Sequence, residues 1–123
     1  MLTKLKITSN REAISIPYLF TYNIFPNEQG ENIAKAYLKV VKEERAEWRP
    51  LAKEIISNAV KGTIDGMSVI SVYDVKEGKL EELMAIQQKH LLVYQNIPGY
   101  RYRMEVRFKI TEAVEMLGMK FPE

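Results

Sequence analysis

The sequence predicts an α+β fold in one domain: a four-stranded antiparallel sheet, two helices on one face of the sheet, and a short C-terminal helix. Three observations indicate this fold. Charged and apolar residues alternate strictly from residue 101 to residue 110, which is typical of a β-strand. Two longer segments carry apolar residues at helical spacing. An Asp-Gly pair separates two further strand-like runs, as in a β-hairpin.

The first strand is expected at residues 18–25, "YLFTYNIF", where aromatic and β-branched residues accumulate before Pro26-Asn27. Neither of its two faces is polar throughout, so we expect a central strand that is covered on both sides. The preceding segment has one weakly alternating run at Leu5 and Ile7, and we expect residues 1–13 to lie at the periphery of the domain.

A first helix is expected in "NEQGENIAKAYLKVVKEERAEW". Its apolar residues share one side of the helix: Ile33, Ala34, Tyr37, Leu38 and Val41. We expect Trp48 to pack in the core and the charged run "KEERAEWR" to form a solvated face. The apolar spacing continues to residue 59, but Pro50 opposes one continuous helix, because an interior proline costs about 3 kcal/mol.

After Pro50, the Asp65-Gly66 pair predicts an antiparallel hairpin with strands at residues 54–61 and 67–75. A second helix is expected at residues 79–95, because the chain has a helical apolar pattern there and Pro98-Gly99 stops it. The expected core face of this helix consists of Leu80, Leu83, Met84, Gln87, Leu91 and Tyr94.

The alternating strand follows directly, and Thr111 is placed to begin a last short helix that Gly118 ends. The order β-α-β-β-α-β is that of a ferredoxin-like sandwich, with both helices on one face of the sheet. The other face is left bare. Because large exposed apolar patches mark interaction surfaces, we expect a homodimer or a higher homo-oligomer.

Three segments carry a resemblance to known proteins: "DGMSVISVYDVKEGKLEEL", "VYQNIPGYRYRMEV" and "TEAVEMLGM". The chain resembles the dimeric α+β-barrel group of ferredoxin-like proteins, and within it a family of small uncharacterised proteins of thermophilic archaea. The resemblance covers roughly residues 18 to 119. It implies a pairing of two sheets, bare face to bare face. It carries no catalytic residue over, since the group includes cofactor-free monooxygenases, lactone isomerases, haem enzymes and small-molecule binders.

Composition excludes several classes of function. The 18 Lys and Arg residues nearly balance the 16 Asp and Glu residues, so we expect no nucleic-acid partner. The absence of cysteine excludes disulfides, a thiolate nucleophile, a zinc ribbon and an iron–sulfur cluster. No long apolar window and no signal-peptide pattern is present, so we expect a cytoplasmic protein that does not enter a membrane. The absence of cysteine, a charged fraction of 28% and the many Ile, Lys, Glu and Tyr residues together suit a thermophile.

No motif predicts a cofactor or a metal site. The sequence has no GxxxxGK[ST] or GxGxxG loop, and its acidic residues show no convincing metal-ligand spacing. The one histidine, His90, lies at the edge of the second helix's apolar face. We interpret it as a partly buried structural residue, since catalysis or haem ligation requires a partner or cofactor within reach.

The charged face of the last strand has three possible roles. Its cations can protect a sheet edge from aggregation. They can instead project into a cavity between subunits, where an arginine fork suits a carboxylate or phosphate. A third role, binding of single-stranded RNA, requires exposed aromatic side chains beside the cations, and those of this strand point the other way. The residues predicted to bind a ligand are Arg103, Arg107, Asn23, Asn58 and Tyr22.

The sequence therefore favours a homo-oligomeric binding or interaction module that holds a small anionic or partly apolar ligand between its subunits. The alternative is an enzyme of the cofactor-free monooxygenase or isomerase type in the same cavity. An enzyme of that kind needs an acid/base pair in an enclosed pocket. Glu105, flanked by Arg103 and Arg107, is the one candidate for that pair.

Overall fold

The structure is a computed structural model and describes residues 16–122. The predictions for residues 1–13 lie outside this range. The described chain forms, in order, β1 (Tyr18–Phe25), a 3₁₀ turn η1 (Asn27–Gln29), α2 (Gly30–Trp48), β2 (Ala52–Thr63), β3 (Gly66–Val75), α3 (Leu80–Leu91), a 3₁₀ turn η2 (Leu92–Tyr94), β4 (Arg101–Arg107) and α4 (Ile110–Met116). The predicted order of strands and helices is confirmed.

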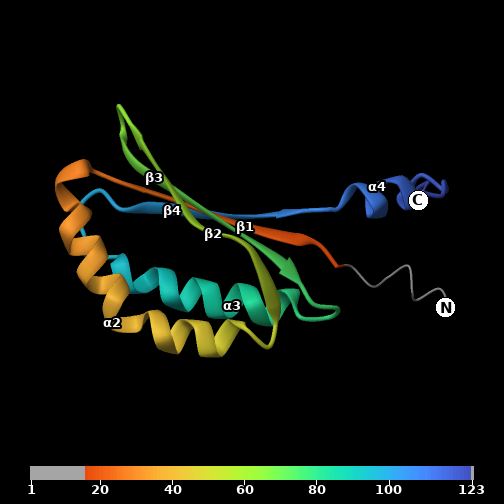
Figure 1. Cartoon of the computed structure of the whole chain (residues 1–123), viewed down its shortest axis with the longest axis horizontal. Coiled ribbons are helices and arrows are strands. Elements are labelled where there is room, and N and C mark those ends of the chain that lie inside the picture. The colour runs from red at the N-terminus through yellow and green to blue at the C-terminus, as the bar shows by residue number, and fades with distance from the viewer. Residues whose placement is uncertain (1–15, 123) are drawn as a thin grey trace.

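The four strands form one antiparallel sheet in the order β2-β3-β1-β4. Helices α2 and α3 lie side by side on one face of this sheet, and α4 lies beyond the end of β4 (Figure 1). The predicted ferredoxin-like arrangement is therefore confirmed. The opposite face carries no helix in the described part of the chain (Figure 1), and we call it the free face.

Strand alternation decides which β1 side chains meet the helices. Leu19, Thr21 and Phe25 are buried on the helix side, whereas Phe20 and Tyr22 lie on the free face. Leu19 belongs to the main core cluster, which joins the sheet to both helices. The other buried members of this cluster are Trp48, Leu51, Ala52, Tyr73, Val75 and Leu83. The prediction that Trp48 packs in the core is confirmed.

The predicted hairpin is confirmed, but its turn lies one residue earlier than the Asp-Gly pair suggests. The loop consists of Ile64 and Asp65, and Gly66 already pairs with Thr63 as the first residue of β3. Gly66 has a φ of 128°, which side chains disfavour. The Thr63 hydroxyl closes the turn: it accepts from the Asp65 amide at 3.1 Å and donates to the Gly66 carbonyl at 2.7 Å.

Helix α2 covers the sheet less completely than its apolar stripe predicts. Trp48 is its one buried residue, and Leu38, expected in the core, is 71% exposed. The reason is that Ile33, Tyr37 and Val41 line an open space between α2 and the sheet. The helix ends before Pro50, as predicted.

The C-terminal end differs from its prediction by two residues. Strand β4 ends at Arg107, and α4 begins at Ile110 with Lys109, not Thr111, at its N-terminal boundary. The Glu112 carboxylate explains this start, because it accepts hydrogen bonds from the amides of Lys109 at 3.3 Å and Ile16 at 2.8 Å. No helix within residues 16–122 is both long enough and apolar enough to cross a membrane.

Candidate functional site

A cavity of about 350 Å³ separates the sheet from α2 and α3, and we call it the helix–sheet cavity. Its volume lies within the usual range for small-molecule sites. Much of its wall is aromatic: Phe25, Tyr37, Trp48, Tyr73, Tyr94 and Tyr100. Ala34 and Arg45 on α2 and Ser57 and Val60 on β2 also line it and are exposed, so the cavity opens to solvent between α2 and β2.

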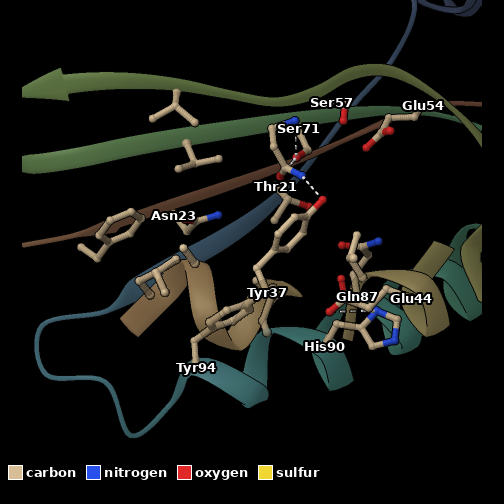
Figure 2. Close-up of a pocket in the computed structure, with 18 of the residues that line it drawn as sticks. Thr21, Asn23, Tyr37, Glu44, Glu54, Ser57, Ser71, Gln87, His90 and Tyr94 are labelled. Carbon is tan, nitrogen blue, oxygen red and sulfur yellow. Dashed lines mark hydrogen bonds and ion pairs between the residues drawn. The ribbon is translucent and has the colours of Figure 1, made fainter. Parts of the chain in front are cut away.

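On the sheet side, the cavity is lined by Thr21 of β1 and Ser71 of β3, which pair with each other across the sheet (Figure 2). Both residues are buried. The Thr21 hydroxyl has no hydrogen-bond partner among the described residues. A buried hydroxyl without a partner costs free energy, so its presence at a cavity wall requires an explanation.

Asn58 enters the cavity through an irregularity in β2. The pairing of β2 with β3 shifts register between Ile56 and Ala59, and Asn58 between them has a φ of 42°, in the left-handed region. Bulges of this kind re-aim side chains and occur frequently beside functional sites. The Asn58 amide group donates to the Tyr37 hydroxyl at 3.3 Å, and its carbonyl accepts from the Ser71 hydroxyl at 2.8 Å.

Tyr37 thus reaches from α2 across the cavity toward the sheet (Figure 2). Two further tyrosines of the cavity wall are buried. Burial raises the pKa of Tyr73 and Tyr94 far above its ordinary value, and nearby carboxylates add to the effect. These phenols are therefore neutral over the physiological range and act as hydrogen-bonding groups, not as bases.

On the helix side, His90 of α3 lies between two carboxylates of α2. Its Nε2 is 2.6 Å from Glu47 Oε1, and its Nδ1 is 3.9 Å from Glu44 Oε1. Figure 2 shows Glu44, Gln87 and His90 together at one end of the cavity. The side chain of Glu44 is 14% exposed, and Glu44 Oε1 has no hydrogen-bond partner among the described residues.

The two carboxylates beside His90 have pKa values displaced in opposite directions. Burial raises the pKa of Glu44, an effect that the charge of His90 reduces and that of Glu47 increases. Hydrogen bonds from Lys89 and then His90 lower the pKa of Glu47. Carboxyl groups whose environments separate their pKa values in this way are typical of acid/base sites.

The free face has a different character. Its cations lie over the aromatic rings of β1: Arg103 over Tyr22 at 4.2 Å, Arg107 over Phe20 at 5.1 Å, and Lys109 over Tyr18 at 5.3 Å. Glu105 lies among them and accepts hydrogen bonds from Arg107 at 2.7 Å and the Tyr22 hydroxyl at 3.2 Å. The hydrogen bond from Arg107 lowers the pKa of Glu105 most strongly, which makes this carboxylate a weak base.

The structure divides the predicted ligand-binding residues between the two faces of the sheet. Tyr22, Arg103 and Arg107 lie on the free face, with Glu105. Asn23 and Asn58 line the helix–sheet cavity instead. The reason for Asn23 is strand alternation, because it follows Tyr22 and pairs with Tyr102, whose position also faces the helices. Within one subunit, these five residues do not form a single site.

The interpretation of "KEERAEWR" as a solvated helix face was wrong for Glu44 and Glu47, which contact His90. The sequence does contain a signal for Glu44. It lies three residues after Val41 and four before Trp48, in line with the apolar stripe of α2. No pattern in the sequence singles out Thr21. Within residues 16–122, no three His, Asp or Glu side chains are grouped so that they could hold a metal ion.

Comparisons with known proteins bear on the fold. No protein-family model matches the chain, and no curated protein matches it. Among solved structures, the chain is similar to a dimeric ferredoxin-like protein from an uncultured marine organism. The two share 18% sequence identity with a TM-score of 0.52, over 76% of this chain and 96% of the other. This likeness supports the ferredoxin-like fold of the chain.

Proposed function

We propose that the protein is a homo-oligomeric binding protein that holds a small, partly aromatic ligand in the helix–sheet cavity. The observation that carries this proposal is that two residues of the cavity lining, Thr21 and Glu44, each have a buried oxygen, Oγ1 and Oε1, without a hydrogen-bond partner among the described residues. Proteins rarely leave such atoms unsatisfied in their interior. A ligand that exchanges hydrogen bonds with these side chains removes the cost.

The lining suits a ligand with an aromatic or apolar body and a few polar groups. Tyrosine, tryptophan and phenylalanine side chains supply flat walls, and the polar groups of Asn23, Asn58 and Gln87 converge on the same space. Pockets that combine apolar walls with a small number of placed polar groups are the usual form of small-molecule sites.

Self-association belongs to the same proposal. The free face carries a row of large β1 side chains, and the similar solved structure is described as dimeric. If two free faces pair, Tyr22, Arg103 and Arg107 lie between the subunits. Binding of an anionic ligand there, as the sequence predicts, is a hypothesis separate from binding in the helix–sheet cavity.

The alternative function is an enzyme of the cofactor-free monooxygenase or isomerase type. One observation favours it: Glu44 and His90 form a buried pair of titratable groups at the wall of the helix–sheet cavity. General acid/base catalysis needs such a pair within reach of a bound molecule. Glu105 is a weaker candidate, since its hydrogen bond from Arg107 lowers its pKa.

The proposal is tested by blocking the cavity. Trp48 is the one tryptophan of the chain and lines the cavity, so its fluorescence reports on binding there. Benzyl alcohol is a suitable first probe, because it is a neutral aromatic molecule with one hydroxyl group. We expect it to change the Trp48 emission in a saturable way.

Two matched variants give the control. Ala34→Phe places a ring at the cavity mouth, whereas Ala46→Phe makes the same change at an exposed position of α2 outside the cavity lining. We expect Ala34→Phe to weaken binding of benzyl alcohol at least about tenfold and Ala46→Phe to leave it unchanged. Equal affinity in both variants, or no saturable response in the wild-type protein, contradicts the proposal.

A further inference from the structure

The contacts of His90 form a row of three side chains across the junction of α2 and α3. At one end, Glu47 is 37% exposed at its side chain and also binds Lys89 Nζ at 2.8 Å. In the middle, His90 is buried, with its side chain 11% exposed. At the other end, Glu44 lines the helix–sheet cavity. The row Glu44–His90–Glu47 therefore connects the cavity wall with solvent.

The roles of the two imidazole nitrogens follow from the distances. The short contact of Nε2 with Glu47 Oε1, at 2.6 Å, fits an N–H donated to an ionised carboxylate. The other ring nitrogen, Nδ1, then faces Glu44, and its distance to Glu44 Oε1 is 3.9 Å. At this distance, Nδ1 and Glu44 Oε1 face each other without a hydrogen bond, and burial favours the protonated form of the Glu44 carboxyl group by raising its pKa.

Besides His90, the charged groups in the cavity lining are two carboxylates, Glu44 and Glu54, and one guanidinium. The guanidinium is that of Arg45, which lies exposed at the mouth. Other titratable groups also face Glu44 from the elements packed around it. These are Tyr37 and Glu47 on α2, Tyr73 on β3, His90 on α3, Tyr94 on η2 and Tyr100 before β4.

We propose that the helix–sheet cavity binds an aromatic amine in its cationic form, with the ammonium group beside Glu44, and that binding expels the proton held by the buried Glu44 carboxyl group. The proposal rests on the proposed function, because it names the ligand class of the same cavity. The ammonium group supplies the positive charge that the proton supplied before. The proton leaves through His90 and Glu47 to solvent, and no covalent bond of the ligand changes.

Two features of the cavity lining favour a cationic aromatic ligand, its aromatic rings and its carboxylates. The aromatic walls suit a cation, since the faces of tyrosine and tryptophan rings attract positive charge. The hydroxyl of Thr21, which is 4% exposed and has no partner among the described residues, offers a further polar group at the wall. An anionic ligand fits less well, because it would meet Glu44 and Glu54.

The test compares benzylamine with benzyl alcohol at a series of pH values. One proton released per ligand makes the dissociation constant of benzylamine fall roughly tenfold per pH unit in the range where Glu44 is protonated. Benzyl alcohol carries no charge, so its affinity stays constant with pH. Both titrations are followed by Trp48 fluorescence and by NMR.

His90 gives a second readout, because it is the one histidine of the chain and its ring signals need no assignment. Because Glu44 faces the ring, bound benzylamine shifts these signals over the same pH range in which its affinity changes, whereas the effect of bound benzyl alcohol on them is the same at every pH. Glu44→Gln keeps the shape of the side chain and removes its charge, so it flattens the pH dependence of benzylamine binding. Glu43→Gln, at an exposed neighbouring position, retains the wild-type pH dependence.

The outcomes separate this inference from the proposed function. If both probes bind with the same pH dependence, or if Glu44→Gln retains the wild-type pH profile for benzylamine, the amine assignment is overturned and the cavity remains a binding site. If neither probe binds, the proposed function and the inference both fail.

Discussion

Thr21 shows how a single buried atom connects stability with function. Its residue is 4% exposed, and its hydroxyl has no partner among the described residues. A buried polar group without a hydrogen bond destabilises the folded state by about 1 to 3 kcal/mol. A residue that lowers stability in this way at a cavity wall is expected where a ligand provides the missing partner.

We predict that Thr21→Val stabilises the ligand-free protein by about 1 kcal/mol, because valine has the same shape without the unsatisfied hydroxyl. The measurement is urea denaturation, from the midpoint at an unchanged slope. Ser71→Ala is the comparison, since the Ser71 hydroxyl does have a partner in Asn58 at 2.8 Å, and its loss should destabilise. A destabilised Thr21→Val variant would show that this hydroxyl is satisfied in solution.

Glu44 gives a prediction for the pH dependence of stability. Its pKa in the folded state is raised above the ordinary value of 4.5, chiefly by burial. At pH values between 4.5 and this raised pKa, the folded protein therefore binds more protons than the unfolded chain. Consequently this group lowers the free energy of unfolding as the pH rises through that range, and the loss persists at higher pH.

Glu44→Gln removes this loss, so its stability relative to wild type should increase as the pH rises above 4.5, the ordinary pKa of the carboxyl group. Glu43→Gln removes the same charge from an exposed position of α2 and should show no such trend. Denaturation midpoints at several pH values provide the measurement. A stability difference between Glu44→Gln and wild type that is the same at every pH would contradict the assignment.

At the scale of elements, the β2–β3 hairpin depends on a close approach between its turn and the end of β1. A Cβ atom at Gly66 would lie 2.3 Å from the Phe25 carbonyl oxygen, and the residue also has a positive φ of 128°. Gly78 offers a matched comparison, because it has a φ of 73° and open space around it.

We predict that Gly66→Ala destabilises the protein by at least about 1 kcal/mol more than Gly78→Ala. Both variants have the cost of a positive φ, and the added methyl group meets backbone only at Gly66. Thermal or urea denaturation of the two variants measures the difference. Equal destabilisation would mean that the turn moves away from Phe25 easily.

Much of the fold was predictable because its signals are local. The hairpin follows from Asp65-Gly66, and the end of α2 from Pro50. The boundary of α4 that was wrong depends only in part on a distant contact. Helix α4 begins at Ile110, where Glu112 accepts from the nearby Lys109 amide in a capping box. Glu112 also binds the amide of Ile16, 96 residues away in the sequence, and local capping preferences do not contain this second contact.

The candidate site was less predictable for a similar reason. The cavity exists because α2 stands away from the sheet at Tyr37 and Val41, although their spacing is that of an ordinary core stripe. His90 gains its two carboxylates only through the packing of α3 on α2. Asn58 faces the cavity through a left-handed φ at a bulge, which simple strand alternation does not predict.

At the scale of the whole molecule, the free face poses the question of assembly. The cations of β4 lie over the β1 rings and cover part of them, which lessens the apolar area open to a partner. Ile70 of β3 lies on the same face, because it pairs with Tyr22. Pairing of two such faces would leave polar and apolar groups in contact across the interface.

We predict that the protein is at least dimeric at micromolar concentration and buries on the order of 1,500 Å² or more in total. Ile70→Glu on the free face should dissociate it, whereas Leu38→Glu, on the exposed side of α2, should not. Light scattering coupled to size-exclusion chromatography measures both. A wild-type mass of 14.3 kDa, that of one chain, would remove the argument for pairing.

Intermolecular nuclear Overhauser effects between benzyl alcohol and the protein would show whether the space between the sheet and the helices is a ligand site. We predict effects to the rings of Trp48, Tyr37 and Tyr94, which line the cavity, and their loss in Ala34→Phe. Effects confined to Phe20 and Tyr22 would place the ligand on the free face and contradict the claim.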